Sequence, residues 1–408
     1  MQKPGSALCY NSTVSATALC VRLIDPSLDP GVAMWGDATG ACQPSAFEWL
    51  GTLVAAGVPV RAGADASVDD GEGLLLVPDP DSIDFEVQIG RPLLTGPPPE
   101  PEQRLAAVRD ALGALVRPDM RGVMALRLDD PGASMKRLLQ DWAHDDVPAE
   151  AWSALWAALG DGRMSVFCCP GWVCDDGTIV PSRSANPDEW AHLDEGRAHG
   201  FLDLECHGFT HLDPDVQAWL GAPDGRTNPA WFREMWPPRF EREPSVEAQV
   251  AVIGRWQAEC GSATALVAPG EAWGLNTVTA ARRQGLKLFN SWGICRLDLP
   301  VPTWSVGVGS PYLDEADPAW CQRDVPVVGY WHDRDMAVAG PSWAPGHLEA
   351  WRECGVRRLV AFSDLAAAYG TEVDAALVDG EVVVRRAPPG WPLRIEHRGR
   401  IRCRSAAG

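Results

Sequence analysis

Two histidines spaced four residues apart, His207 and His211, stand in the segment ECHGFTHLD (205–213). If this segment turns helically, residues i and i+4 share one face, and both imidazoles can reach one divalent cation at about 2.0–2.2 Å. The same spacing also fits two histidines that cap a turn or pack in a core. The segment is not a zincin helix, because Gly208 stands where that motif has its glutamate. The pair is a candidate metal site.

Two adjacent carboxylates, Asp129 and Asp130, close the apolar segment GVMALRLDD (122–130). Successive side chains of a strand point to opposite faces, so a loop beyond the strand must bring both carboxylates into one cleft. Such a pair can divide the work, because one carboxylate can bind a metal while its neighbour accepts a proton.

A single histidine, His332, follows another apolar segment in VVGYWHDRD (327–335). A lone histidine after a strand is more often structural than catalytic. Here the strand is predicted to deliver it to the edge that also receives the histidine pair and the aspartate pair, which favours a catalytic role.

The elements that would position these residues alternate between strands and helices. Apolar runs predict the strands, and stretches of helical period fall between them. The predicted strands are 122–130, 163–169, 201–206, 262–269, 286–291, 325–331 and 356–363, and the predicted helices include 246–260, 277–285 and 346–355. This alternation predicts an α/β fold with a parallel sheet covered by helices, with enough repeats to close into a barrel. The polar residues cluster after the strands, where such a barrel keeps its active site.

Three units are predicted along the chain. They are a small N-terminal α/β domain over 1–100, a barrel over 101–370 and a C-terminal β segment over 371–408. The first boundary is placed at TGPPPEPE (95–102), because four prolines cannot continue a helix or a central strand. Within these units we expect strands at 18–24 and 73–79, helices at 45–58 and 102–116, and short antiparallel strands near the C-terminus.

The composition narrows the class of protein. The chain has 408 residues and a formal net charge of −20, which repels phosphate backbones and argues against nucleic acid as a partner.

No signal-peptide pattern and no apolar run of membrane-spanning length is visible, so we expect a cytoplasmic protein without a membrane partner. The 12 cysteines form no C-x-x-C pair and are expected to be reduced thiols. The 19 tryptophans fit either core packing or stacking against sugar rings.

These pieces, in this order, resemble the NodB-homology family of polysaccharide deacetylases over about residues 122–370. The resemblance lies in RLDD (127–130), HGFTH (207–211), YWHD (330–333) and the closing VRRLVAFSDLAAAY (356–369). It implies an irregular (β/α) barrel that holds a divalent metal. It further implies Asp129 as the general base, His332 as the general acid, and Asp130, His207 and His211 as the metal ligands.

The sequence also departs from the family's pattern. The third motif usually carries an arginine that orients the base, whereas LVAPGEAWG (266–274) has none, so Arg127 or Arg334 is expected to substitute. The fourth motif is not recognisable in LFNSWGICRLD (288–298). For substrate binding we expect a wall of tryptophans together with two polar residues. The candidates are Trp273, Trp292, Trp304, Trp331, Glu271 and Arg334.

The resulting hypothesis is a metal-dependent deacetylase that removes an N-acyl group, most simply acetyl, from an amino sugar or a small sugar-containing metabolite. Two imidazoles and a carboxylate favour Zn²⁺, with Co²⁺, Ni²⁺ or Mn²⁺ as alternatives. Backbone N–H groups around Gly270 and Glu271 would stabilise the oxyanion. The alternatives are a deformylase or another C–N amide hydrolase on the same barrel, and a catalytically silent sugar-binding protein.

Overall fold

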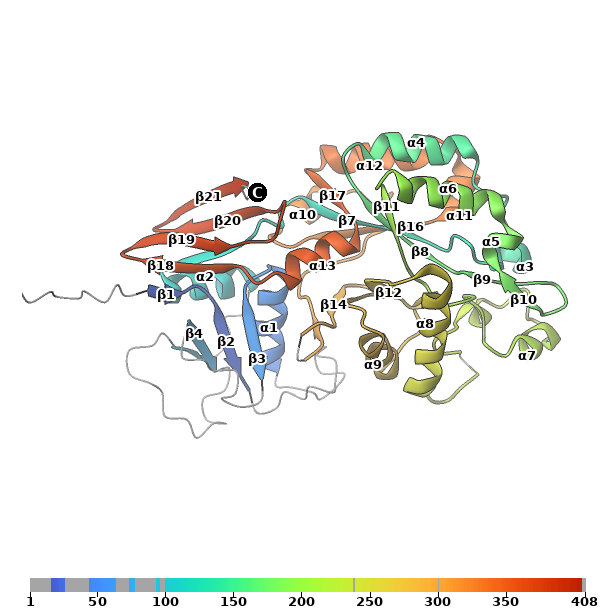
Figure 1. The fold of residues 1–408 in the computed structure, drawn as a ribbon, viewed down its shortest axis with the longest axis horizontal. Coiled ribbons are helices and arrows are strands. Elements are labelled where there is room, and N and C mark those ends of the chain that lie inside the picture. The colour runs from blue at the N-terminus through green and yellow to red at the C-terminus, as the bar shows by residue number, and fades with distance from the viewer. Residues whose placement is uncertain are drawn as a thin grey trace, which may run out of the picture.

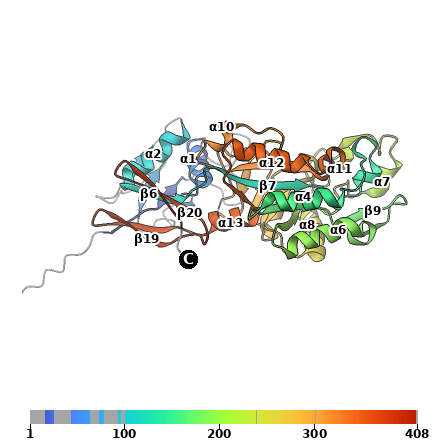
Figure 2. The ribbon, with the colours of Figure 1, turned by 90° about the horizontal axis from the view of Figure 1, so that it is seen from above.

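The computed structural model describes residues 16–25, 44–63, 73–77, 93–95, 100–237, 239–299 and 301–405. The molecule is elongated, with two regions side by side (Figures 1 and 2). One end holds the N-terminal sheet together with the C-terminal strands, and the other end holds a large sheet with its helices. Residues 96–99 of the proline-rich segment at 95–102 lie outside the described residues.

The large sheet has nine strands. They are β7 (Val123–Asp129), β8 (Met164–Cys168), β11 (Leu202–Cys206), β12 (Ala265–Val267), β13 (Leu288–Asn290), β14 (Ile294–Arg296), β15 (Thr303–Trp304), β16 (Val327–His332) and β17 (Arg358–Val360). Their order is β15-β14-β13-β12-β11-β8-β7-β16, with β17 also paired to β7. The pairs from β16 to β13 are parallel, whereas β14 and β15 run antiparallel. All seven residues of β7 are buried, as expected for a parallel strand covered on both faces.

The closure of this sheet into a barrel is not confirmed. Within the described ranges, no strand pair joins the outer strands β15 and β16. Instead, the non-strand segment 309–313 lies along the outer edge of β16. Its backbone bonds run from Val328 N to Gly309 O (3.0 Å) and from Leu313 N to Tyr330 O (2.8 Å).

Helices surround the large sheet. They are α3 (Met135–Leu138), α4 (Ala149–Leu159), α5 (Ser182–Ala185), α6 (Pro187–Ala198), α7 (Val216–Gly221), α8 (Val246–Cys260), α9 (Leu275–Arg283), α10 (Pro318–Cys321), α11 (Asp333–Ala339), α12 (Trp343–Glu353) and α13 (Phe362–Gly370). In Figure 1, α4, α6 and α12 lie above the strands, and α8 and α9 lie below them. Helix α8 begins where Ser245 accepts a hydrogen bond from Ala248 N and ends before Gly261. No helix among the described residues is long and apolar enough to cross a membrane.

The tryptophans pack mainly in the core. Those fully buried among the described residues are Trp49, Trp152, Trp190, Trp219, Trp256, Trp331 and Trp351. Buried indoles provide large apolar area, so core packing accounts for much of the tryptophan content.

The N-terminal and C-terminal segments interleave. A parallel sheet, β3 (Val60–Gly63)-β2 (Val21–Ile24)-β4 (Leu74–Val77)-β5 (Leu93–Thr95), packs with α1 (Pro44–Ala55) and α2 (Pro101–Leu112). Two antiparallel sheets, β1 (Ala16–Ala18)-β18 (Asp374–Val378)-β19 (Glu381–Arg386) and β21 (Arg400–Ser405)-β20 (Pro392–His397)-β6 (Ala114–Pro118), combine strands from both ends of the chain. The domain boundaries predicted near residues 100 and 370 remain a prediction.

One predicted helix is shorter than expected. The helix expected over 102–116 ends at Leu112, because Gly113 adopts a left-handed φ of 75° that terminates it. The residues that follow form β6, which pairs with β20. Helical period and strand-like apolarity overlap in this short segment, so the pattern alone did not separate them.

Candidate metal centre and active-site cavity

The register of the parallel strands assembles the site. In the pairing of β16 with β7, His332 lies opposite Asp129. Strand β8 pairs with the other edge of β7, and β11 pairs with β8 and ends at Cys206, one residue before His207. Because parallel strands end at the same edge, the aspartates and histidines identified in the sequence meet there.

Asp130, His207 and His211 form a compact cluster. The Oδ1 atom of Asp130 lies 3.2 Å from Nε2 of His207 and 3.3 Å from Nε2 of His211. One ligand atom from each residue lies within 4.8 Å of the others, and all three residues are buried. This is a donor set that divalent cations bind, with two imidazoles and one carboxylate.

The hydrogen bonds around the cluster leave the lone pairs of His207 Nε2 and of the Asp130 carboxylate free to bind a cation. Nδ1 of His207 lies 3.0 Å from the carbonyl oxygen of Val267, and because a carbonyl can only accept, Nδ1 carries the proton. The Nε2 lone pair of His207 therefore points toward Asp130. Neither carboxylate oxygen of Asp130 has a hydrogen-bond partner among the described residues, although both are buried. Electron-rich atoms this close repel one another unless a cation neutralises them, so the residues fit a divalent metal.

The electrostatics of the cluster favour the ligand forms of Asp130 and His211, whereas at His207 burial, which would lower the pKa, is outweighed by the carboxylates of Asp129 and Asp130, which raise it. Burial alone would raise the pKa of the Asp130 carboxyl, but the neighbouring imidazoles of His211 and His207 hold that pKa below its ordinary value. Burial lowers the pKa of His211 to about 4, although Asp130 opposes the change. Asp130 is therefore ionised and His211 neutral near pH 7, the states in which they can bind a metal.

The two histidines are not held by a helix, which was the condition under which their spacing would place them on one face. Residues 207–211 form an irregular loop after β11, and His211 has a φ of 69°. The loop is organised by Glu234, whose Oε2 accepts hydrogen bonds from the backbone N–H groups of Phe209 (2.7 Å), Thr210 (2.9 Å) and His211 (3.0 Å). Gly208 is required here, because a Cβ atom would lie 2.4 Å from Glu234 Oε2. A buried carboxylate, instead of helical periodicity, brings the imidazoles together.

The loop that follows β7 is held in a similar way. Asp130 has a φ of 80°, and the chain turns there out of the strand. Glu189 accepts hydrogen bonds from Gly132 N (2.7 Å) and from the buried ammonium of Lys136 (2.8 Å). These bonds fix the segment that carries Asp130.

Asp129 is held by an arginine of its own strand. Nε of Arg127 lies 2.9 Å from both carboxylate oxygens of Asp129, and Nη2 lies 2.5 Å from Oδ2. The same guanidinium donates to Asn290 Oδ1 (2.9 Å) and to Glu271 Oε1 (3.1 Å). Arg127 thus occupies the orienting position for which the sequence offered Arg127 or Arg334. Asp129 is ion-paired, unlike Asp130, so the two aspartates differ in environment.

His332 is oriented by Tyr312 and Asp335. Nδ1 of His332 lies 2.9 Å from the Tyr312 hydroxyl, which also makes a short hydrogen bond to Asp335. Burial and that hydrogen bond raise the pKa of Tyr312, so the hydroxyl keeps its proton and donates it to Asp335. The hydroxyl oxygen then accepts from Nδ1–H of His332, which fixes the tautomer. Asp335 also accepts the backbone N–H of His332 (2.9 Å).

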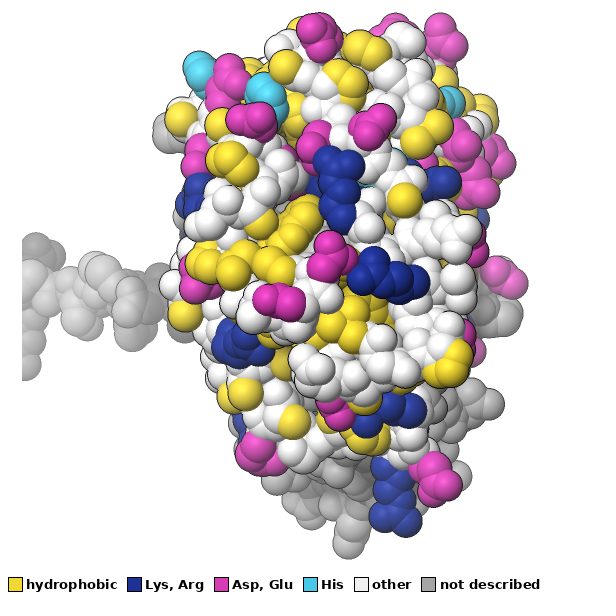
Figure 3. All heavy atoms as spheres, turned by 90° about the vertical axis from the view of Figure 1, so that its right-hand side faces the viewer, with side chains coloured by type: hydrophobic (Ala, Val, Ile, Leu, Met, Phe, Trp, Pro, Cys, Tyr) yellow, Lys and Arg dark blue, Asp and Glu magenta, His cyan; other side chains and the backbone are white. Residues whose placement is uncertain are grey.

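A cavity of about 380 Å³ is lined by Asp129, Asp130, His207, His211 and His332, and it is bordered also by Trp142, Phe232 and Tyr330. Trp142 contacts His332 edge to face, with ring centroids 5.1 Å apart. Figure 3 views the end of the molecule that lies at the right of Figure 1, where hydrophobic side chains gather between basic and acidic ones. A cavity with apolar walls and a few convergent polar groups is typical of a small-molecule site.

The four tryptophans expected as a sugar wall do not line this cavity. Trp331 is fully buried in the core. Trp273 and Trp304 stack on each other with ring centroids 5.3 Å apart, and Trp292 is 71% exposed. Trp142, which the sequence reading did not select, is the tryptophan at the cavity. Sequence shows that an indole is present but not which indoles face the core.

The two polar candidates have different positions. Glu271 lines the cavity, where it pairs with Arg127 and accepts from Ser291 Oγ (2.5 Å). Arg334 lies outside the lining and stacks over Trp142, with its guanidinium carbon 5.4 Å from the ring centroid. The backbone N–H of Glu271 bonds to Ala268 O (3.1 Å), so it is not available as an oxyanion donor in this conformation.

The residues missed by sequence reasoning are mainly positioning groups, namely Glu234, Asn290, Tyr312 and Asp335, together with Trp142. Only Asp335 carried a local signal, because a carboxylate three residues after a strand-ending residue typically caps the following helix. The others reach the site from segments distant in sequence.

No family model and no curated protein matches the sequence. Among solved structures, the chain is similar to family 4 carbohydrate esterases and deacetylases. A family 4 carbohydrate esterase from Streptomyces lividans is 13% identical with a TM-score of 0.29, covering 59% of this chain and 91% of its own. The chitin deacetylase from Colletotrichum lindemuthianum is 14% identical with a TM-score of 0.33, covering 61% and 88%.

A protein with another activity also matches at this level. The 4-alpha-glucanotransferase from Thermococcus litoralis is 11% identical with a TM-score of 0.36, covering 60% of this chain and 40% of its own. With TM-scores below 0.5, these likenesses carry no weight for the function, which has to be inferred from the site itself.

Proposed function

We propose that the protein is a metal-dependent amide hydrolase that removes an N-acyl group, acetyl in the simplest case, from an amino sugar. The observation that carries this proposal is the pair of adjacent aspartates in contrasting environments. Asp130 is buried without a hydrogen-bond partner beside two imidazoles, whereas Asp129 is held by Arg127 at the same cavity. A hydrolase needs both a metal ligand and a base that stays off the metal.

Asp130, His207 and His211 would hold the metal, and Zn²⁺ suits this ligand set best. When bound, the cation supplies Lewis acidity that polarises an amide carbonyl and acidifies water. Three protein ligands leave coordination positions open, as catalytic zinc sites require.

Asp129 accepts the proton of the attacking water. A carboxylate offers about four lone-pair sites, and Arg127 contacts both oxygens through two N–H groups, which leaves room for a further donor. Arg127 also fixes the direction in which that lone pair points. The chain thus provides an oriented base at the cavity.

His332 donates a proton to the departing amine nitrogen, which is otherwise too basic to leave. Tyr312 holds Nδ1–H, so that Nε2 is the atom available to the substrate. The Tyr312 hydroxyl also bonds to the carboxylate of Asp335, so the three side chains hold the imidazole of the general acid in one orientation.

The substrate is a small N-acylated sugar or glycoside. A cavity of about 380 Å³ lies at the lower end of the range for small-molecule sites. Trp142 and Tyr330 border the cavity, and their aromatic rings can pack against the apolar face of one sugar ring.

The second candidate is a deformylase or another C–N amide hydrolase, which would use the same base, acid and metal ligands. The acid and base positioned at one cavity favour either enzyme over a silent sugar-binding protein, because binding alone requires neither. Formate release distinguishes a deformylase from a deacetylase.

The test has two parts. Protein purified without added metal and then loaded with Zn²⁺ is expected to hold one ion per chain, whereas the His207→Ala variant is expected to hold much less. Acetyl release is then compared among small N-acetylaminoglycosides, chitin oligomers and peptidoglycan, with formate measured in parallel. Metal binding that survives His207→Ala, or hydrolysis of polymers without hydrolysis of small glycosides, would contradict the proposal.

A further inference from the structure

A second cavity, of about 670 Å³, lies at the opposite end of the large sheet. It is bordered by Val123 at the start of β7, Arg163 just before β8, and Arg358 at the start of β17. Strand β7, which delivers Asp129 to the first cavity, therefore begins at the second one. The two cavities share no lining residue.

Five arginines and three aspartates line this second cavity, so arginines outnumber carboxylates in its lining, in a chain whose net charge is −20. The arginines are Arg121, Arg163, Arg352, Arg357 and Arg358. A concave basic surface on an acidic protein concentrates anions locally.

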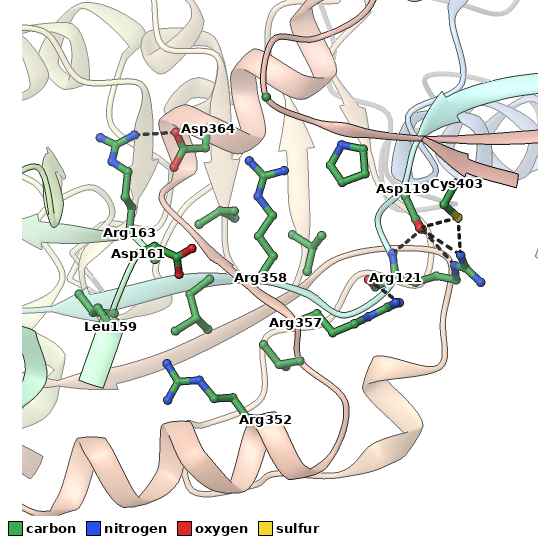
Figure 4. A pocket seen from close by; sticks show the side chains of 17 residues that line it. Asp119, Arg121, Leu159, Asp161, Arg163, Arg352, Arg357, Arg358, Asp364 and Cys403 are labelled. Atoms are coloured by element: carbon green, nitrogen blue, oxygen red, sulfur yellow. Dashed lines mark hydrogen bonds and ion pairs between the residues drawn. The ribbon is translucent and has the colours of Figure 1, made fainter. Parts of the chain in front are cut away.

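Three of the arginines are committed to structural ion pairs, and one of them, Arg352, pairs with Glu349 (3.5 Å) and donates to Ala158 O (2.5 Å). Arg121 donates to Asp119 through Nε and Nη2 (both 3.0 Å), and Arg163 donates to Asp364 (2.6 Å) and Asp203 (2.7 Å). Figure 4 shows the Arg163–Asp364 pair and the Arg121–Asp119 pair at the two sides of the cavity. They fix its walls and leave little capacity for a ligand.

Arg357 and Arg358 retain free donors. Among the residues that the structure describes, the Arg358 guanidinium makes no hydrogen bond or ion pair and stacks over Trp391, 4.2 Å from the ring centroid. Arg357 donates once, to Arg121 O at 3.2 Å. In Figure 4 both extend from the start of β17 to different sides of the cavity. Burial lowers the pKa of Arg358, which means that its charge lacks a full counter-charge.

We infer that this cavity binds an organic phosphate, with Arg357 and Arg358 contacting the phosphate oxygens. A phosphate monoester carries about −1.5 to −2 charge at pH 7, which the two guanidinium groups without a carboxylate partner among the described residues, Arg357 and Arg358, can balance. Guanidinium groups bind phosphate through paired hydrogen bonds. The lining also includes Val356, Leu359 and Pro392, which provide an apolar wall for the body of the ligand.

This inference does not depend on the proposed hydrolase activity, because it uses no residue of the metal centre. The experiment is isothermal titration calorimetry of the full chain with phenyl phosphate and with inorganic phosphate. Phenyl phosphate is expected to bind at one site per chain and more tightly than inorganic phosphate, because only the ester reaches the apolar wall. Equal binding of the two probes would overturn the assignment of an organic ligand.

Three variants make the site assignment specific. Arg358→Gln is expected to weaken phenyl phosphate binding about tenfold, because charge-assisted hydrogen bonds are lost. Arg357→Gln should also weaken it, and since Arg357 is exposed this variant should fold normally. Asp161→Asn should instead strengthen binding about twofold, because an exposed carboxylate of the lining is neutralised.

Arg385→Gln is the matched control, because Arg385 lies on β19 and outside the cavity. Its affinity should equal that of the parent. Thermal unfolding of each variant checks its folding. Absence of saturable phenyl phosphate binding, or an affinity unchanged in both Arg357→Gln and Arg358→Gln, would overturn the inference.

Discussion

Arg127 lies two residues before Asp129 on the same strand and forms an ion pair with it. Its Nε and Nη2 atoms contact both carboxylate oxygens of Asp129. Residues i and i+2 of a strand share a face, so the strand geometry itself delivers the pair. A similar arrangement recurs at Arg296 and Asp298, with contacts of 2.9 and 2.8 Å, away from the cavity. The chain therefore contains two arginine–aspartate pairs of this kind, one with its aspartate in the cavity lining and one outside that lining.

Replacement of Arg127 by lysine is expected to lower kcat about tenfold to a hundredfold. Lysine keeps the positive charge but cannot hold a carboxylate through a planar fork, so Asp129 loses its fixed orientation. Metal content should not change. Arg296→Lys is the control, because it removes an equivalent fork without touching the cavity. An equal loss of activity in both variants would show that the effect on Arg127 is only structural.

Substitution of Asp129 and substitution of Asp130 should have different effects on turnover and on metal binding. Asp129→Asn is expected to abolish turnover while metal remains bound, and Asp130→Asn is expected to lose both. The side chains are chemically identical, so only their surroundings distinguish them. Metal analysis and turnover are measured on the same preparations. If Asp129→Asn loses the metal and Asp130→Asn retains it, the assigned roles are reversed.

His332→Ala is expected to lower kcat by about 10² to 10⁴, the contribution of one general acid or base. Tyr312→Phe should give a smaller decrease, because it frees Nδ1 of His332 but leaves the imidazole in place. Neither change should release metal. Tyr369→Phe, which removes a buried hydroxyl bonded to Ala55 O, is the matched control and should keep full activity. An unchanged kcat in His332→Ala would return this residue to a structural role.

The sequence predicted much of the large sheet, because long apolar strands and amphipathic helices have clear periods. The helix predicted at 246–260 matches α8, and the strands ending at Asp129 and His332 were expected from apolar runs. The predicted closure of the sheet into a barrel was not confirmed. The number of strand–helix repeats in the sequence does not determine whether the two outer strands pair.

The positioning residues were harder to predict. Glu234 lies more than 20 residues beyond the loop that it holds, in a stretch with little regular structure, so no period connects the two. Arg127 could be found because its partner lies on the same strand. The sugar-wall prediction relied on residue type alone, and residue type does not distinguish the buried Trp331 from Trp142 at the cavity.

Glu234→Ala should weaken metal binding about 10- to 100-fold, the effect typical of losing a group that positions a ligand. Three backbone N–H groups would lose their acceptor, and the loop that carries His207 and His211 would relax. Glu234→Gln should bind metal nearly normally, because an amide oxygen can accept the same bonds. The control is Glu205→Ala, because Glu205 is also buried and also accepts two backbone N–H bonds, from Thr264 and Ala265. A similar loss of metal affinity in both alanine variants would contradict a specific role for Glu234.

Glu205 should also make the stability of the protein depend on pH. Burial raises its pKa to about 8, whereas the ordinary value is 4.5, although the N–H groups of Ala265 and Thr264 oppose this shift. The unfolded chain therefore releases the proton at lower pH than the folded chain does. The stabilisation from the protonated form is complete below pH 4.5 and is lost as the pH rises to about 8.

Glu205→Gln should remove this dependence, because glutamine does not titrate and its amide oxygen can still accept both bonds. The melting temperatures of the parent and the variant are compared at pH 5 and pH 8, with a chelator present so that metal release does not contribute. The parent should lose more stability than the variant between the two values. Other groups titrate equally in both proteins, so the difference reports Glu205 alone. A parent and a variant that lose the same stability would show that the Glu205 carboxylate is ionised in the folded protein.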